Sequence, residues 1–158
     1  MSAPAGKAIE IERKFLLKRL PRNLAKYRHT KIEQGYLATE RRNGVQVRLR
    51  REGASYSLTY KRGRNGAREE REIALTGRQF QALWPATEGR RLSKTRYRVP
   101  WKEWCIEIDK YRGRHDGIVV AEVEFESVEN RDAFVPPQWF GREVTGEARY
   151  SNVVLAMS

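Results

Sequence analysis

Charged residues alternate with apolar ones along seven of eight short, β-rich runs of this chain, and this alternation limits what the chain can fold into. Side chains at positions i, i+2 and i+4 of a strand lie on the same face. In the first run Glu10, Glu12 and Lys14 therefore share one face, and Ile9 and Ile11 share the other. Acidic pairs lie on four of the runs, and basic pairs lie mostly on other runs, so the two signs are largely sorted by strand.

The spacing of these runs predicts a mainly β domain with a few helices. Strands are expected at residues 9–17, 35–39, 45–51, 55–61, 68–75, 94–99, 104–111 and 118–126. Turn pairs such as Asn43-Gly44 and Asn65-Gly66 separate several of them, which predicts one antiparallel sheet or barrel. Helices are expected at 21–29, 76–84, 127–134 and 145–156, packed on the outside, and the third begins at Ser127. Thr76-x-x-Gln79 is a capping-box pattern for the second. We expect a flexible N-terminus over residues 1–8 and one domain over 9–158.

Two arrangements would satisfy the alternation. The charged face can lie in solvent over an apolar core, or it can line a wide, hydrated barrel whose apolar exterior is covered by helices. Isolated buried charges are costly, so a charged interior needs ions to fill it. Clustered carboxylates would take Mg²⁺ or Mn²⁺, and converging Arg and Lys would take phosphate.

The net charge points to a polyanionic partner. Thirty-two Lys and Arg against twenty Asp and Glu give a formal charge of +12, which suits nucleic acid, an anionic membrane or a phosphate-rich small molecule. No apolar run is long enough to cross a membrane as a helix, and the N-terminus lacks the apolar stretch of a signal peptide. Because Cys105 is the single cysteine, no internal disulfide can form. We therefore expect a cytoplasmic protein without a membrane partner.

Several motifs, in order along the chain, resemble the CYTH superfamily of triphosphate tunnel metalloenzymes. Glu10-Ile11-Glu12-Arg13-Lys14 reads as the ExExK signature of that family, and the resemblance extends to about Ala156. The other matching motifs are Gln34-Gly35-Tyr36-Leu37, Arg48-x-Arg50, Leu58-Thr59-x-Lys61, Glu70-x-Glu72, Lys94-Thr95-Arg96-Tyr97, Glu107-x-Asp109, Glu122-x-Glu124, Val144-Thr145 and Arg149-Tyr150-x-Asn152. The resemblance implies an eight-stranded antiparallel β-barrel forming a tunnel, in which a divalent metal assists reactions of triphosphates.

The resemblance also implies roles for individual residues. The expected metal ligands are Glu10, Glu12, Asp109, Glu122 and Glu124, with Glu70, Glu72 and Glu107 as additional tunnel acids. The expected phosphate-binding cations are Lys14, Arg48, Arg50, Lys61, Lys94 and Arg96. Tyr36 and Lys94 are the rival proton acceptors for an attacking water. Arg98 has the phase of these cations but no matching motif, so its orientation stays open.

The expected activity is metal-dependent hydrolysis of inorganic triphosphate, with Mg²⁺ or Mn²⁺ as cofactor. Two alternatives remain. One is hydrolysis or cyclisation of an organic triphosphate such as ATP or thiamine triphosphate. The other is a polyphosphate- or RNA-binding module, whose binding would need no metal and would weaken steeply with salt. We expect a small-molecule triphosphate rather than nucleic acid as the partner, and a homodimer is possible.

Overall fold

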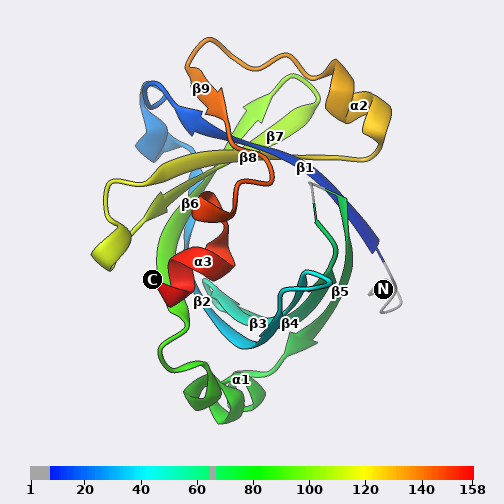
Figure 1. Cartoon of the computed structure of the whole chain (residues 1–158). Coiled ribbons are helices and arrows are strands. Elements are labelled where there is room, and N and C mark those ends of the chain that lie inside the picture. The colour runs from blue at the N-terminus through cyan, green and yellow to red at the C-terminus, as the bar shows by residue number, and fades with distance from the viewer. Residues whose placement is uncertain (1–7, 65–66) are drawn as a thin grey trace.

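The computed structural model describes residues 8–64 and 67–158, which form a closed, eight-stranded antiparallel β-barrel (Figure 1). Around the barrel the strands follow the order β5-β4-β3-β2-β6-β7-β8-β1, and β1 pairs with β5 to close it. The strands are β1 (Ala8–Leu17), β2 (Arg28–Glu40), β3 (Val45–Glu52), β4 (Ser55–Arg62), β5 (Ala67–Leu75), β6 (Arg91–Trp101), β7 (Trp104–Tyr111) and β8 (Val119–Phe125). This confirms the barrel implied by the resemblance.

Strand β1 forms the seam of the barrel. One of its edges pairs with β8 from Ile11 to Leu16. Its other edge is shared, first by β5 from Ala8 to Ile11 and then by the short β9 (Phe140–Glu143), which meets Phe15 and Leu17. β9 was not predicted, because four residues without clear alternation form a strand only beside an existing edge.

Two α-helices lie outside the barrel, as expected. Helix α1 (Gly77–Leu83) begins with the predicted capping box between Thr76 and Gln79, and η2 (Trp84–Thr87) follows it. Helix α2 (Val128–Ala133) begins at the predicted cap Ser127. Both helices contact the outer surface of the strands, α1 at β4 and β5 and α2 at β1 and β8. The remaining short turns are η1 (Leu24–Lys26), η3 (Gly113–His115) and η4 (Ala148–Tyr150).

Helix α3 (Asn152–Met157) occupies a different place, at one end of the barrel (Figure 1). It contacts β6 and β2, and its buried Leu155 and Ala156 pack with the inward-facing Tyr36 and Tyr111. The last helix was expected to begin at Thr145, but the chain forms η4 and then a helix capped by Ser151. Thr145 accepts instead a hydrogen bond from the backbone of Lys14 at 3.0 Å.

The main hydrophobic core lies on the outer surface of β1, β6, β7 and β8. Ile106, Ile108 and Val123 are fully buried there beneath Phe134 and Phe140 from the segment after α2. This arrangement inverts an ordinary barrel, because the apolar faces of the strands point outward. The inner faces are left for polar groups.

The expected helix at residues 21–29 is wrong over most of its length. Only Leu24–Lys26 form a single 3₁₀ turn, and β2 already begins at Arg28. β2 is extended because its first half pairs with β6, from Arg28 to Gly35, before its second half pairs with β3. Long-range pairing of this kind outweighs a local helical pattern.

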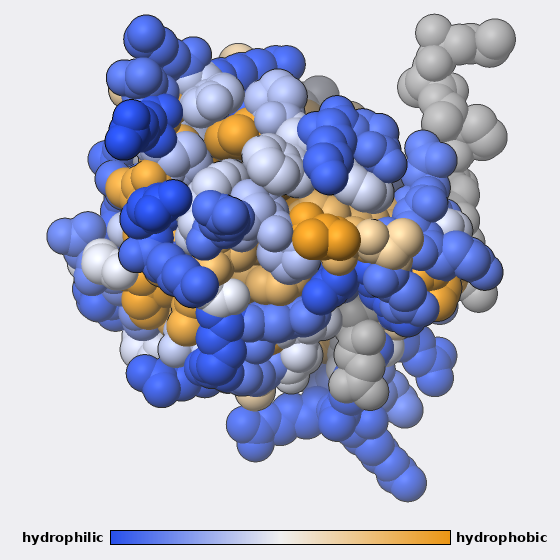
Figure 2. All heavy atoms as spheres, turned by 90° about the horizontal axis from the view of Figure 1, so that it is seen from above, coloured by the Kyte–Doolittle hydropathy of each residue, from blue (hydrophilic) through white to orange (hydrophobic). Residues whose placement is uncertain are grey.

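Two sequence expectations fall outside the described part of the chain. Except for Ala8, which begins β1, the expected flexible N-terminus lies outside it, and so does the Asn65-Gly66 turn. Among the described residues, no helix has the length and apolar character needed to cross a membrane. Figure 2 shows one face of the molecule, on which hydrophilic side chains predominate and hydrophobic ones form several separate patches.

Candidate active site

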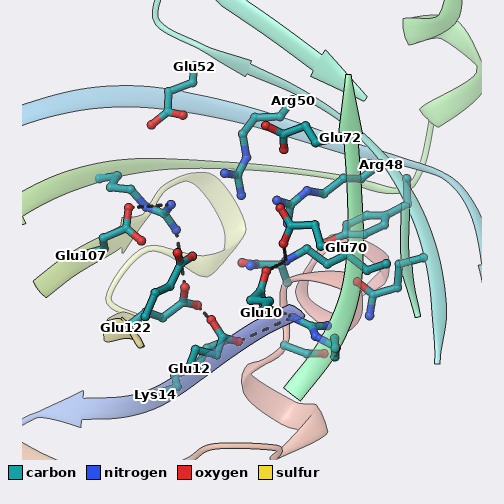
Figure 3. A pocket seen from close by; sticks show the side chains of 18 of the residues that line it. Glu10, Glu12, Lys14, Arg48, Arg50, Glu52, Glu70, Glu72, Glu107 and Glu122 are labelled. Atoms are coloured by element: carbon teal, nitrogen blue, oxygen red, sulfur yellow. Dashed lines mark hydrogen bonds and ion pairs between the residues drawn. The ribbon is translucent and has the colours of Figure 1, made fainter. Parts of the chain in front are cut away.

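The alternating charged residues point into the barrel, where they line a cavity of about 260 Å³. Inward residues face one another across neighbouring strands. Lys61 pairs with Glu70 between β4 and β5, and Arg96 pairs with Asp109 between β6 and β7. Figure 3 shows the labelled side chains converging on a common space from several strands. Of the two arrangements that the sequence left open, the structure has the charged, barrel-lining one.

Most of the predicted site residues line this cavity. They are Glu10, Glu12, Lys14, Tyr36, Arg48, Arg50, Lys61, Glu70, Glu72, Arg96, Glu107, Glu122 and Glu124. Two predicted residues, Lys94 and Asp109, do not line it, and their side chains have no exposed surface. The structure therefore brings the predicted set together, while the role of each residue stays a prediction.

The carboxylates gather on four neighbouring strands, β7, β8, β1 and β5, and we call their inward carboxylates the acidic wall. Its members are Glu10, Glu12, Glu70, Glu72, Glu107, Asp109, Glu122 and Glu124. Glu12 lies directly opposite Glu124 in the β1–β8 register, and Glu107 lies opposite Glu122 between β7 and β8. Like charges placed opposite each other repel. Glu72 and Glu124 are exposed at the rim, whereas Glu122 is buried.

Part of the acidic wall lacks enough positive charge. Burial, together with Glu122 and Glu10, raises the pKa of Glu12 to about 7. Burial and a hydrogen bond with Glu10 raise the pKa of Glu70 to about 7 as well. Burial and neighbouring carboxylates also raise the pKa values of Glu107 and Glu124. The pKa values of these four groups are raised because nearby cations only partly offset burial and the repulsion between the carboxylates.

This donor set fits a divalent metal ion, although its geometry is not that of a ready-made site. Within residues 8–64 and 67–158, no three His, Cys, Asp or Glu side chains are arranged to hold a metal as they stand. Carboxylate oxygens are nevertheless the ligands that Mg²⁺ and Mn²⁺ prefer. A divalent cation would supply the positive charge whose shortage raises the pKa values of Glu12 and Glu70.

A different cluster, formed by Lys94, Arg96 and Asp109 and called here the Asp109 cluster, is fully compensated. Asp109 accepts hydrogen bonds from Lys94 Nζ at 2.7 Å and from Arg96 Nε and Nη2 at 2.8 and 2.9 Å. Arg96 also reaches Glu107 at 3.1 Å. Although burial opposes ionisation, Arg96 and Lys94 lower the pKa of Asp109 to about 2. Both carboxylate oxygens of Asp109 are therefore occupied by protein cations.

Glu10 is also paired, at the start of β1. Lys61 Nζ lies 2.6 Å from Glu10 Oε2, and Arg68 Nη2 lies 3.0 Å from Oε1. Arg68 comes within 3.6 Å of Glu12 as well. Burial opposes ionisation, but Glu70, Lys61 and Arg68 lower the pKa of Glu10 far below its ordinary value. Glu10 is thus ionised and its Lys61 partner is already engaged.

Arg48 and Arg50 of β3 form the part of the opposite side that awaits a negative charge. Arg48 is 6% exposed, and its buried Nε has no hydrogen-bond partner among the described residues. Gln34 Oε1 accepts from Arg50 Nε at 3.0 Å and from Nη2 at 2.7 Å. Burial and the neighbouring Arg48 and Arg96 lower the pKa of Arg50 to about 10. Buried cations that repel one another make a binding site for an anion.

The two rival proton acceptors lie in different surroundings. Tyr36 lines the cavity, and its hydroxyl accepts a hydrogen bond from Gln34 Nε2 at 2.9 Å. Lys94 lies behind the lining against Asp109 and the ring of Tyr111. Burial, with help from Arg96 and Arg50, lowers the pKa of Lys94 to about 7 despite the attraction of Asp109.

Several lining residues escaped the sequence reasoning. Arg68 has the phase of Glu70 and Glu72, so the two-residue period would have found it. Arg98, whose orientation was left open, lines the cavity and pairs with Glu52 at its rim. The remaining lining residues that were not predicted are Gln46, Ser151 and Asn152. No periodic signal marks Ser151 and Asn152, because they reach the tunnel from the segment that ends it.

Comparison with known proteins agrees with this geometry. The CYTH domain family model matches residues 8–151. An inorganic triphosphatase of Nitrosomonas europaea is 42% identical over 151 residues, which cover 94% of this chain and 97% of that protein. An inorganic triphosphatase of Acetivibrio thermocellus is 33% identical over 146 residues, which cover 90% of each chain.

Solved structures show the same architecture. The crystal structure of an inorganic triphosphatase is 41% identical, covers 94% of this chain and 95% of its own, and gives a TM-score of 0.69. A Pyrococcus horikoshii protein at 15% identity, covering 78% of this chain and 82% of its own, gives a TM-score of 0.58 and shares the fold alone. The family model spans the whole tunnel, from β1 to the segment that closes it, and this chain belongs to the CYTH domain family.

Proposed function

We propose that this chain is a metal-dependent hydrolase that acts on inorganic triphosphate. The observation that carries the proposal is the cavity itself, in which every lining side chain is polar or charged apart from the ring of Tyr36. Carboxylates short of positive charge line one side, and the unpaired Nε of Arg48 lies on the other. A phosphate chain bound to metal supplies both missing charges, and the cavity offers no apolar surface for an organic group.

Arginine and lysine side chains on several strands would bind the substrate together. Arg48 and Arg50 on β3 face the bore from one side, and Arg96 on β6 faces it from another. The guanidinium groups of Arg48 and Arg50 suit bidentate contacts with phosphate oxygens, whereas Arg96, already bonded to Asp109 and Glu107, adds fixed positive charge. Lys14 and Lys61 complete the set and are held in place by Glu122 at 3.1 Å and Glu10 at 2.6 Å. Positive charge fixed in this way offsets the negative charge that develops during phosphoryl transfer.

The metal would be held by Glu10, Glu12, Glu122 and Glu124. When bound, Mg²⁺ or Mn²⁺ would neutralise phosphate oxygens and lower the pKa of a coordinated water. Asp109 was expected in this set, but unlike Glu10 it does not line the cavity, its side chain has no exposed surface, and both its oxygens accept hydrogen bonds from Lys94 and Arg96. We assign Asp109 to fixing those two cations instead.

The proton of the attacking water needs an acceptor near the bore. Lys94, with a pKa lowered to about 7, is partly unprotonated near neutral pH and suits this role. Tyr36 lines the cavity directly, and its hydroxyl is oriented by a hydrogen bond from Gln34, which also accepts from Arg50. The comparison of Lys94→Arg with Tyr36→Phe separates them, because only loss of the acceptor shifts the acidic limb of the pH–rate profile.

Phosphate release from a panel of substrates tests the proposal. The panel contains inorganic triphosphate, pyrophosphate, ATP and thiamine triphosphate, each with Mg²⁺, with Mn²⁺ and with EDTA. We expect turnover of inorganic triphosphate that needs the metal and is lost in Glu12→Gln. Glu103→Gln is the matched control, since Glu103 is exposed in the turn between β6 and β7. Metal-independent binding with no turnover would contradict the proposal.

A second candidate rests on a neighbouring cavity. A vestibule of about 520 Å³ shares Lys14, Arg68 and Ser151 with the tunnel and adds the apolar Val153 and Met157. Such a mixed surface would admit the organic part of a nucleotide or of thiamine triphosphate. Faster turnover of an organic triphosphate than of inorganic triphosphate, or formation of a cyclic nucleotide, would favour this candidate. A cytoplasmic location and a homodimer remain predictions from the sequence.

A further inference from the structure

The segment at the junction of η4 and α3 accepts hydrogen bonds from two of the predicted site lysines, Lys14 and Lys94. Lys14 Nζ donates to the backbone oxygen of Tyr150 at 3.2 Å, and Lys94 Nζ donates to Oδ1 of Asn152 at 3.3 Å. Asn152 also lines the cavity, whereas Lys94 lies just behind it. The final helix, which lies at one end of the barrel (Figure 1), is thus linked to the charged interior through the backbone of Tyr150 just before it and the side chain of Asn152 in its first turn.

The amide of Asn152 is fixed in one orientation. The hydroxyl of Tyr111 donates to the same Oδ1 that accepts from Lys94. Lys94 Nζ carries hydrogens to donate whether its amine is charged or neutral, and the amide oxygen that it shares with the Tyr111 hydroxyl is the atom assigned to face it. Tyr111 is 2% exposed and lies beneath the ammonium of Lys94, 5.5 Å from ring centroid to Nζ. The contact therefore joins two buried side chains, Lys94 and Tyr111, to the half-buried amide of Asn152.

The position of Asn152 is set by how α3 is docked. Leu155 and Ala156 are buried against Leu92 and Val120 inside the barrel end. At the other end of α3, a ring nitrogen of His115 lies 2.6 Å from the backbone oxygen of Leu155. Contacts at both ends fix the helix in place, so Asn152 lies beside Lys94 without a bound substrate.

We propose that Asn152 is a positioning residue, which holds the amine nitrogen of Lys94 toward the cavity, where Lys94 is the proposed proton acceptor. This inference rests on the proposed triphosphatase function and adds the C-terminal helix to its machinery. Without the Asn152 oxygen, Asp109, at 2.7 Å, is the one hydrogen-bond acceptor left to Lys94 within residues 8–64 and 67–158, and that carboxylate lies outside the cavity lining. The flexible lysine side chain then turns toward Asp109. Arg48 and Arg50 do not contact Asn152, so substrate binding changes less than turnover does.

Steady-state kinetics on the full chain test this proposal, with phosphate release from inorganic triphosphate and Mg²⁺. In Asn152→Ala we expect kcat to fall by about tenfold or more, the loss typical of a hydrogen bond to a charged group, while KM stays within about twofold. Asn152→Asp keeps an oxygen at this place and should recover most of the kcat. Tyr111→Phe frees the amide to turn, and its kcat should fall by a smaller factor, about threefold.

A second variant separates positioning from stability. His115→Ala loosens the far end of α3 and leaves Asn152, Lys94 and Tyr111 untouched. It should lower Tm as Asn152→Ala does, yet keep kcat within about twofold of the unmodified chain. Equal kcat in Asn152→Ala and the unmodified chain would overturn the proposal, and so would loss of kcat in His115→Ala matching that in Asn152→Ala. If the unmodified chain turns over no triphosphate at all, the proposed function itself fails.

Discussion

The Asp109 cluster and the rest of the acidic wall use the same residue types in opposite ways. In the Asp109 cluster two cations occupy both oxygens of one buried carboxylate, and its pKa lies near 2. In the rest of the acidic wall, Glu12 lies opposite Glu124 across β1 and β8, and the pKa of Glu12 lies near 7. The first arrangement is satisfied by the protein alone. The second gains its missing positive charge only from a bound cation. Asp109 therefore suits a scaffold for its two cations, whereas the carboxylates around Glu12 suit a binding site.

Breaking the Asp109 cluster should give the largest effect on stability. Asp109→Asn leaves Lys94 and Arg96 buried with their shared charge removed, and its NH₂ group opposes their donors. We expect the free energy of unfolding to fall by about 3–5 kcal/mol, as when one partner of a buried ion pair is lost. Urea unfolding followed by circular dichroism measures this. A change under about 1 kcal/mol would mean that the cluster is no scaffold.

The same kind of substitution in the acidic wall should act on turnover instead. Glu12→Gln removes a proposed metal ligand and should lower kcat/KM by at least about 100-fold, the upper range for changes around a metal site. The metal-free chain should become more stable at about pH 8, because one carboxylate of a repelling group is gone. Phosphate release and Tm in EDTA measure the two effects. Destabilisation equal to that of Asp109→Asn would erase the distinction between the two regions.

The pH dependence of stability should sharpen the comparison. Glu12 and Glu70 release protons near 4.5 when unfolded and near 7 when folded, so the folded chain binds more protons between these values. Their contribution to the metal-free stability is full below about pH 4.5 and is lost as the pH rises through about 7. Mg²⁺ should therefore raise Tm more at about pH 7.5 than at about pH 5.5, because it competes with these protons. A gain in Tm that is the same at both pH values would contradict this.

The smallest effect is expected at the rim. Arg98 pairs with Glu52 and is 27% exposed, so its ion pair is partly screened by water. Arg98→Ala should change kcat/KM for inorganic triphosphate by less than about fivefold, against a much larger loss in Arg48→Ala. Kinetics of the two variants in parallel make the measurement. Equal losses would place Arg98 with the deep substrate-binding cations.

The period of two along the strands was enough to predict which charges share a face, from Glu10 to Glu124, and the family resemblance was needed to predict that this face lines the barrel. It could not tell the Asp109 cluster from the rest of the wall, because that difference depends on which residue of a neighbouring strand lies opposite. Arg96 reaches Asp109 through the β6–β7 register, and no local pattern encodes a register. The same limit explains the first half of β2, the short β9 and the contact between Asn152 and Lys94. Each depends on a partner far away in sequence.

The seam strand has a consequence for how the enzyme comes into being. β1 is made first by the ribosome, yet its edges are completed only by β5 and by β8, which ends at Phe125. Glu10, Glu12 and Lys14 therefore lack their β5 and β8 neighbours through most of synthesis, and the acidic wall is complete only once the barrel has closed. Closing a loop of this length is slow, because the entropy cost of bringing distant strands together comes before the stabilising contacts form. In this chain the barrel and its charged cavity are therefore completed in the same late step of folding.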